Sequence, residues 1–250
     1  LKLANGDDHL REGMKSLYRV FKSAPMLGSL IDPRKVLGND LITAGFDDLV
    51  PLLEKALGEE VIRSSDEATE AVLTAQGLLR AAQLLSKRYS LVITNPPYLG
   101  RSNQCDDLKV FCEAHYPNAK QDLANVMLER CVQACNPGGA VQFVMPQNWL
   151  FLASYKKQRE HLLREETWNL LVRLGEGGFD SPQAAGAFTI LLTLTRTPAP
   201  ADWLLRGLDA SAQRTAPEKA ELMRTQELVS LAQKMQLSNP DSRVSLSTLG

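Results

Sequence analysis

The sequence predicts an α/β fold, and three observations support this. After residue 87, short apolar runs rich in β-branched residues alternate with long helical patterns. Clusters of proline and glycine separate these segments. Before residue 87 the apolar spacing is helical only. Strands that alternate with helices are typical of a layered fold with a mainly parallel sheet, and we expect that sheet in the second part of the chain.

Composition limits the classes of protein to be considered. Hydrophobic residues make up 44% and charged residues 23% of 250 residues, which is typical of a folded protein and not of a disordered one. No run of about 18 apolar residues is present, so no membrane span is expected. The formal net charge of -1 gives no overall sign of nucleic-acid binding, so any basic patch must be local.

The four cysteines lack the paired CxxC spacing of a zinc site, and the three histidines are scattered, so no metal site is expected. Free thiols suit a reducing cytoplasm. In the first third, helices are expected over residues 7–23, 41–57 and 65–86, and no catalytic signature accompanies them.

The order of elements after residue 87 follows from the apolar pattern. Strands are predicted over 90–94, 140–145, 168–174 and 187–196, the first of them covered on both faces. Helices are predicted over 104–114, 121–135 and 148–166, the last capped by Asn148. A strand over 202–208 and a helix over 216–236 complete the chain.

The tetrapeptide Asn95-Pro96-Pro97-Tyr98 directly follows the strand at 90–94. Both prolines lack an N–H and have a fixed φ, so the sheet ladder must end at Thr94 or Asn95 and a stiff extended loop must follow. That loop lies at the carboxyl edge of the sheet, where open α/β sheets bind their ligands.

These four residues suit the methylation of an amino nitrogen. The Asn95 side-chain oxygen and the Pro96 carbonyl are two rigid acceptors for an NH2 group, and Tyr98 offers a face for an aromatic ring. Because the lone pair of such a nitrogen is delocalised, hydrogen bonds from both its protons to fixed acceptors favour attack on a sulfonium methyl group. The alternative is that Asn-Pro is an ordinary turn and Pro-Pro only ends the strand.

The chain resembles the gamma-type amino methyltransferases over residues 79–197, in particular the large DNA adenine-N6 methyltransferases of restriction-modification and BREX-type phage-defence systems. The motifs are "AAQLLSKRYSLVITNPPYLG", "DLANVMLERCVQACNPGGAVQFVMPQNWLF", "SYKKQREHLL" and "LGEGGFDSPQAAGAFTILLTLTR". The resemblance implies S-adenosyl-L-methionine as cofactor, double-stranded DNA and other defence-system subunits as partners, and a cytoplasmic location. It also implies the C-terminal half of a Rossmann-like methyltransferase sheet preceded by a helical insertion.

Site residues follow from this resemblance. Asn95 and the Pro96 carbonyl would hold the target amino group, Tyr98 would stack on a flipped adenine, and Phe179 would be a second aromatic contact. Asp122 and Gln83 would lie at the cofactor, although the family commonly carries an acid at the position of Gln83. Taken without the family, Asp122 is an acid at a helix N-terminus and Phe179 anchors a loop.

A local basic patch, Lys156, Lys157 and Arg159, is the candidate for contact with the DNA backbone. Its alternative interpretation is the solvated face of an amphipathic helix.

The glycine-rich cofactor loop of the family is missing before Asn95. We therefore expect a fragment that binds the cofactor weakly or not at all by itself. Its predicted regions are a helical insertion at 1–86, the catalytic half at 87–197, and the start of a connecting or target-recognition region at 198–250. Two alternatives stay open: an enzyme that methylates a protein glutamine or an RNA base, and a non-catalytic DNA-binding or assembly module.

Overall fold

The computed structural model describes residues 15, 18–19, 21–36, 66–179 and 186–246. The predicted helix at 41–57 and most of the one at 7–23 lie outside these ranges. The chain divides into two compact units, Leu1–Lys87 and Arg88–Gly250.

The first unit is helical in its described residues. Its long helix runs over 66–86, close to the predicted 65–86, and the short helix that follows Asp32 packs against it. Leu30, Ile31, Leu79 and Ala82 are buried. The elements are α2 (Ala24–Leu27), η2 (Gly28–Leu30), α3 (Pro33–Val36) and α5 (Asp66–Ser86).

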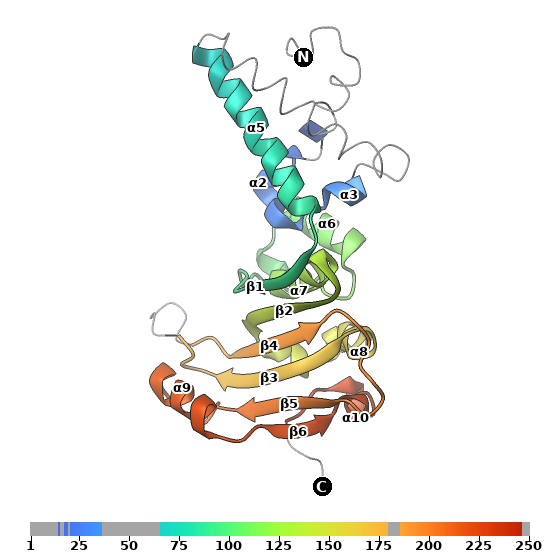
Figure 1. Ribbon diagram of the computed structural model, residues 1–250, viewed down its shortest axis with the longest axis vertical. Coiled ribbons are helices and arrows are strands. Elements are labelled where there is room, and N and C mark those ends of the chain that lie inside the picture. The colour runs from blue at the N-terminus through green and yellow to red at the C-terminus, as the bar shows by residue number, and fades with distance from the viewer. Residues whose placement is uncertain (1–14, 16–17, 20, 37–65, 180–185, 247–250) are drawn as a thin grey trace. The chain divides into compact units, whose positions relative to one another are not determined.

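The second unit is built on a six-stranded sheet, which confirms the predicted α/β class (Figure 1). Its strands are β1 (Tyr89–Thr94), β2 (Cys135–Pro146), β3 (Thr167–Gly175), β4 (Thr189–Thr195), β5 (Leu204–Asp209) and β6 (Val229–Ala232). Its helices are η3 (Arg101–Asn103), α6 (Asp106–His115), α7 (Leu123–Ala134), η4 (Asn148–Leu150), η5 (Ala153–Tyr155), α8 (Lys156–Glu165), α9 (Ala216–Thr225), α10 (Gln233–Gln236) and η6 (Pro240–Ser242). None of the described helices is long and apolar enough to cross a membrane.

The sheet is mixed, so the prediction of a mainly parallel sheet is wrong. The strand order is β1-β2-β4-β3-β5-β6, and β4 lies antiparallel to both of its neighbours. Only the β1–β2 and β3–β5 pairs are parallel. As a result, the amino end of β4 reaches the same edge of the sheet as the carboxyl end of β2, with Thr189 opposite Pro146.

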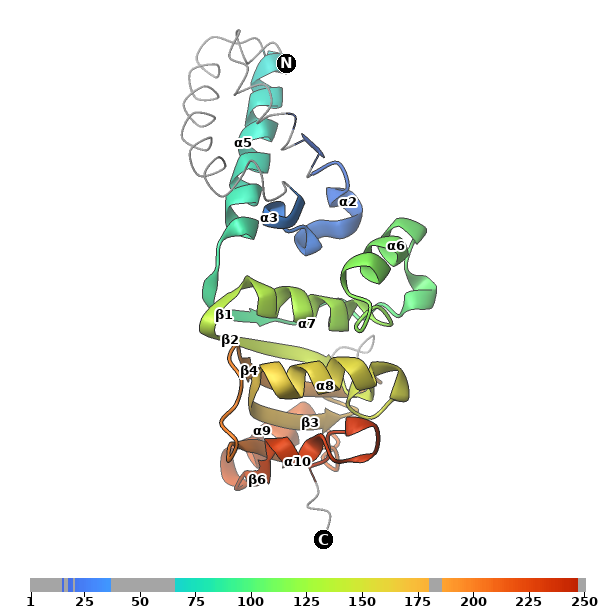
Figure 2. The same cartoon turned by 90° about the vertical axis from the view of Figure 1, so that its right-hand side faces the viewer.

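One face of the sheet carries the main core. Val141, Phe143 and Met145 alternate along β2 and point into it, together with apolar side chains of β3, β4, α7 and α8. Figure 2 shows α7 and α8 running along this face. The two helices are joined by a buried bond from Asn125 Nδ2 to Gln158 Oε1, 2.8 Å long. On a smaller scale, Val172, Leu174 and Leu208 form a second cluster with Met223 of α9.

Strand β1 lies at the edge of the sheet, where only β2 pairs with it. Leu91 and Ile93 are 55% and 67% exposed. The prediction that this strand is covered on both faces is therefore wrong, because the side chains on the face that carries Leu91 and Ile93 are exposed.

Two predicted helices are shorter than expected. Residues 148–155 form two single turns before α8 begins at Lys156, and the Asn148 side chain makes no capping bond. The helix predicted over 216–236 ends at Thr225, since residues 229–232 form β6. That strand pairs with β5, and this long-range pairing replaces the local helical preference.

The segment after β6 is tied to the main core by Gln233. The Gln233 side chain accepts a bond from the Trp168 N–H, 2.8 Å long, and donates to the carbonyls of Leu163 and Glu166 at 2.9 and 2.7 Å. Its amide is buried. Both of its polar groups are therefore satisfied by residues more than 60 positions earlier in the chain.

Candidate functional site

The Asn95–Tyr98 loop begins where β1 ends. Thr94 is the last paired residue of β1 and lies opposite Phe143 of β2. Pro96 is buried, whereas Asn95 and Pro97 are exposed. The prolines thus end the ladder as the sequence predicts, and the Asn95 side chain is left at the solvent-facing carboxyl edge of the sheet.

A hydrogen bond joins the two polar side chains of this loop. The Tyr98 hydroxyl donates to Asn95 Oδ1 at 3.1 Å. Burial is the larger and the nearby Asp122 carboxylate the smaller of two causes that raise the pKa of Tyr98 to about 12. The phenol therefore keeps its proton at neutral pH and orients the Asn95 amide. A carbonyl oxygen has two lone pairs, so Oδ1 can accept a second bond.

Backbone bonds fix the loop from the other side. The Leu99 carbonyl accepts from the Leu123 N–H at 3.0 Å and from Gln104 Nε2 at 3.1 Å. The Arg101 N–H donates to the Gln121 carbonyl at 2.8 Å. The chain after Tyr98 is therefore attached to the start of α7 before it continues into α6.

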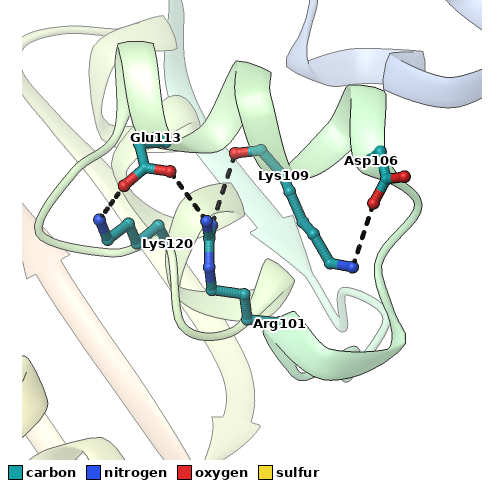
Figure 3. A network of polar contacts seen from close by, with 5 residues as sticks. All are labelled: Arg101, Asp106, Lys109, Glu113 and Lys120. Atoms are coloured by element: carbon teal, nitrogen blue, oxygen red, sulfur yellow. Dashed lines mark hydrogen bonds and ion pairs between the residues drawn. The ribbon is translucent and has the colours of Figure 1, made fainter.

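An ion-pair network holds the α6 segment in this position (Figure 3). Glu113 of α6 pairs with Arg101 at 2.9 Å and with Lys120 at 2.5 Å. The two cations lower the pKa of the Glu113 carboxyl, with the Lys120 bond as the largest cause. Arg101 and Lys120 are the two ends of the 101–120 segment, so their ion pairs with Glu113 hold both ends of this segment together.

Asp122 is the N-cap of α7. Its Oδ1 accepts from the Ala124 N–H at 2.8 Å, and its backbone forms a bridge with Gly100. Burial raises the pKa of this carboxyl, and bonds from the Ala124 and Leu99 backbones lower it. Asp122 thus acts as the helix N-terminal acid, and its contact with a cofactor stays a prediction.

Tyr98 lines an apolar cavity of about 440 Å³ at the carboxyl edge of β1 and β2. Two further aromatic side chains line it, Phe151 after η4 and Phe188 before β4, 41% and 53% exposed. The remaining wall is made by Pro146, Gln147, Asn148 and Ala187. Neither phenylalanine is among the site residues predicted from the sequence. Phe188 could have been found only by placing the amino end of β4 at this edge.

A second cavity of about 430 Å³ adjoins the first, since Gln147 and Phe151 line both. Arg173 of β3 lies in its wall, where Nε donates to Gln147 Oε1 at 3.1 Å and NH1 lies 3.4 Å from Asp209 Oδ2. The side chain is 44% exposed. A half-exposed guanidinium therefore stands directly beside the aromatic cavity.

Two predicted site residues are placed elsewhere. Phe179 is half-buried and is not among the residues that line the cavity of Tyr98. Gln83 lies on α5 in the first unit, where its Oε1 accepts from Arg80 NH1 at 3.4 Å. Their predicted contacts with the base and the cofactor stay predictions.

Of the three basic residues, Arg159 is contradicted as a DNA contact. Its side chain is completely buried and donates to four backbone carbonyls, those of Trp149, Leu152, Asp241 and Ser242. It cannot reach a phosphate while these bonds are made. Lys156 and Lys157 are exposed, and Lys156 lies 3.7 Å from Asp241 Oδ1.

Comparisons with known proteins point to one family. A sequence model described as Eco57I restriction-modification methylase matches residues 40–179, more than half of the chain. The adenine-specific methyltransferase BrxX of Escherichia coli O9:H4 (strain HS) is 30% identical over 71% of this chain and 14% of its own length. PglX, an adenine-specific methyltransferase of Lacticaseibacillus casei (strain Zhang), is 28% identical over 64% of this chain and 13% of its own.

One similar solved structure is that of a nuclease-deletion mutant of the Type ISP restriction-modification enzyme LlaGI in complex with a DNA substrate mimic. The similarity covers 64% of this chain and 18% of the LlaGI chain. The identity is 14% and the TM-score 0.45. The chain thus spans about one seventh of the length of the two curated relatives.

Proposed function

The chain belongs to the Eco57I restriction-modification methylase family, and on that premise we propose that it carries the target-amino half of a DNA adenine-N6 methyltransferase active site. The protein would serve a restriction-modification or phage-defence system, in the cytoplasm, with double-stranded DNA and other subunits of the system as partners. One observation carries this proposal. The Asn95–Tyr98 loop leaves β1 at the carboxyl edge of the sheet, and Tyr98 lines an aromatic cavity there.

In the proposed reaction Asn95 Oδ1 and the Pro96 carbonyl accept hydrogen bonds from the two N–H groups of the adenine amino group. This removes the nitrogen lone pair from conjugation with the ring and directs it at the methyl group that is transferred. The bond from the Tyr98 hydroxyl supports this role, because it fixes the orientation of the Asn95 amide before substrate arrives. Pro97 keeps the Pro96 carbonyl free of a competing neighbouring N–H.

The aromatic cavity supports an adenine that has been turned out of the duplex. Unstacking a base costs a few kcal/mol, and stacking on an aromatic side chain contributes roughly 1–3 kcal/mol. Tyr98 supplies one such surface, and Phe151 and Phe188 line the same cavity. Phe179 does not line this cavity, so its proposed contact with the adenine would be an additional one. We assign the exposed cations Lys156 and Lys157 to the DNA backbone.

S-adenosyl-L-methionine, when bound, supplies the methyl group. Of the residues predicted to hold it, Asp122 stands beside the Asn95 loop, and its Oδ1 is already bonded to the first turn of α7. No glycine-rich GxG sequence precedes Asn95. The residues of this chain therefore fit the target amino group better than they fit the cofactor, and we derive no step through the cofactor from them.

The exposed edge of β1 supports a sheet that continues in the whole protein. Leu91 and Ile93 are exposed apolar side chains, and β1 is an edge strand within the described structure. Folded proteins usually protect such an apolar edge strand from the solvent. We propose that a further strand pairs there. In the same proposal residues 1–86 form a helical insertion, residues 87–197 the catalytic half, and residues 198–250 lead into a connecting or target-recognition region.

The test compares three forms of the full-length protein: wild type, Asn95→Ala and Asn103→Ala. Asn103 is an exposed asparagine in the same loop region and serves as the matched control. Each form is given labelled cofactor with unmodified genomic DNA, RNA or protein. We expect adenine methylation by wild type and Asn103→Ala, and a loss of roughly 10²-fold or more with Asn95→Ala.

Labelling of RNA or of protein glutamine in place of DNA would favour the other amino methyltransferases. DNA binding with no methyl transfer to any substrate would favour a non-catalytic module. Activity that persists in Asn95→Ala would refute the role of this residue.

A further inference from the structure

A polar cleft lies at the opposite edge of the sheet from the Asn95 loop. The loop follows Thr94, whereas the cleft lies where β2 begins, near Cys135, and where β4 ends, near Thr195. Its volume is about 360 Å³. We call it the Glu166 cleft. It is lined by the carboxyl-terminal halves of α7 and α8 and by the turn after β4, with the residues Glu129, Val132, Gln133, His161, Leu162, Glu165, Glu166, Arg196, Thr197 and Pro198.

Acidic groups dominate the charge of this cleft. Glu129 comes from α7, and Glu165 and Glu166 come from the end of α8. The one arginine in the wall, Arg196, donates through NH1 to the Cys135 carbonyl at 2.5 Å. In addition, α7 and α8 both direct their carboxyl ends to this cleft, and the negative end of a helix dipole favours a cation.

Glu166 is a buried residue with one carboxyl oxygen that lacks a hydrogen-bond partner among the described residues. The residue is 6% exposed, and its Oε2 has no hydrogen-bond partner within the described structure. Its backbone is fixed on both sides, because its N–H donates to the Leu162 carbonyl at 3.1 Å and its carbonyl accepts from Gln233 Nε2 at 2.7 Å. A buried polar atom without a partner costs about 1–3 kcal/mol, so a ligand that supplies the partner gains this energy.

We propose that the Glu166 cleft binds an organic cation, an ammonium or guanidinium group on an aliphatic chain, with Glu166 as its principal acceptor. Such a group donates several N–H bonds to carboxylates, and its aliphatic part can pack on Val132 and Leu162. The described residues include no cluster of His, Cys, Asp and Glu able to hold a metal ion, so the chemistry favours an organic cation. The cation could come from a free polyamine or from a lysine or arginine of another protein.

Binding should be linked to a proton. Burial raises the pKa of Glu166 to about 7, with Arg196 lowering it and Glu165 raising it. A bound cation favours the ionised carboxylate, so binding near pH 7 should release protons. The other titratable groups in the wall are Glu129 of α7 and His161 of α8. Arg88 lies beside the cleft, where it donates to the carbonyls of Gln133 and Cys135.

The experiment titrates the protein with spermidine, with N-acetyl-arginine amide and with the corresponding citrulline derivative, in which a neutral urea replaces the guanidinium. Calorimetry in two buffers of different ionisation enthalpy gives the affinity and the proton release. The methyl NMR signals of Val132 and Leu162 report whether the ligand sits in the cleft. The variants are Glu166→Gln and, as a control with the same charge change, Glu227→Gln, whose side chain is exposed and lies outside the cleft.

We expect saturable binding of a cationic probe, proton release, no binding of the citrulline derivative, and an affinity at least tenfold weaker in Glu166→Gln but unchanged in Glu227→Gln. Binding of spermidine alone would identify a free polyamine, and binding of the arginine derivative alone a protein side chain. No binding of either cation, equal binding of the citrulline derivative, or unchanged affinity in Glu166→Gln would overturn the proposal. If Glu166→Gln fails to fold, the comparison of arginine with citrulline on the wild type decides alone.

Discussion

Replacing Arg159 with methionine should destabilise the fold strongly. The buried guanidinium donates to the carbonyls of Trp149 at 2.5 Å, Leu152 at 2.7 Å, Asp241 at 2.8 Å and Ser242 at 3.2 Å. Trp149 and Ser242 are themselves buried, so water cannot replace the lost donor at their carbonyls without a rearrangement. The apolar methionine keeps much of the packing volume, which isolates the effect of the polar bonds.

The expected loss of stability follows from the four carbonyl groups that lose their donor. Each of the two buried carbonyls costs about 1–3 kcal/mol without its donor, and the two carbonyls nearer solvent lose bonds to a charged group that water only partly replaces. Together these terms give a loss of roughly 3–5 kcal/mol in the free energy of unfolding, the range found when one partner of a buried charged network is removed.

Urea unfolding is the suitable assay, because the rings of Trp149 and Trp168 lie 5.7 Å apart in the core and give a fluorescence signal. Lys157→Met is the matched control. This neighbouring side chain is exposed, so we expect a change within about 0.5 kcal/mol. The reasoning fails if Arg159→Met costs less than about 1 kcal/mol. It also fails if this variant loses DNA affinity while its stability is unchanged, since that result would restore Arg159 as a DNA contact.

Three further predictions concern single side chains. Tyr98→Phe keeps the aromatic surface but removes the donor to Asn95 Oδ1. The kcat of the full-length enzyme should therefore fall about fivefold with little change in KM, and an unchanged kcat would contradict this role of the hydroxyl. Lys219→Met removes a buried Nζ that donates to the carbonyls of Leu174, Ala210 and Gln213. Chemical unfolding should show that the free energy of unfolding falls by about 3 kcal/mol, compared with no more than about 0.5 kcal/mol for Lys157→Met, whose side chain is exposed. The pKa of Glu166 is raised in the fold from 4.5 to about 7, so the folded state binds more protons than the unfolded one between these values. Its stabilisation is therefore fully present below pH 4.5 and is lost as pH rises through 7, about 3 kcal/mol in all at about 1.4 kcal/mol per pH unit. This part of the pH dependence should be missing in Glu166→Gln.

The sequence predicts the Asn95 loop well because its cause is local. Two prolines cannot continue a ladder, and the apolar run before them must end where they begin. The aromatic cavity is only partly predictable, since its third ring depends on the direction of β4. The apolar pattern of a strand is the same in either direction, so Phe188 could not be assigned to the edge of Tyr98 from spacing alone.

The roles of Arg159 and β6 could not be predicted for a related reason. In the sequence Arg159 is one charge among several on a helix, and its partners Asp241 and Ser242 lie more than 80 residues further along the chain. Hydropathy assigns such a residue to the surface. Residues 229–232 continue a helical pattern locally and become a strand only because β5 offers an edge.

The polar ties from residues 233–242 to α8 and β3 also set an order of events during synthesis. When α8 leaves the ribosome, the carbonyls of Trp149 and Leu152 that accept from Arg159 NH1 are already present. The partners of Arg159 Nε and NH2 and of the Trp168 N–H are not, because Ser242, Asp241 and Gln233 have yet to be made. At translation rates of about 5–20 residues per second, roughly 4–17 s pass before an interval of 83 residues is complete. During this time the core between α8 and the sheet can form only in an incomplete state. Residues 233–242 therefore complete the packing of α8 and β3, and the nascent domain becomes native only after they are made.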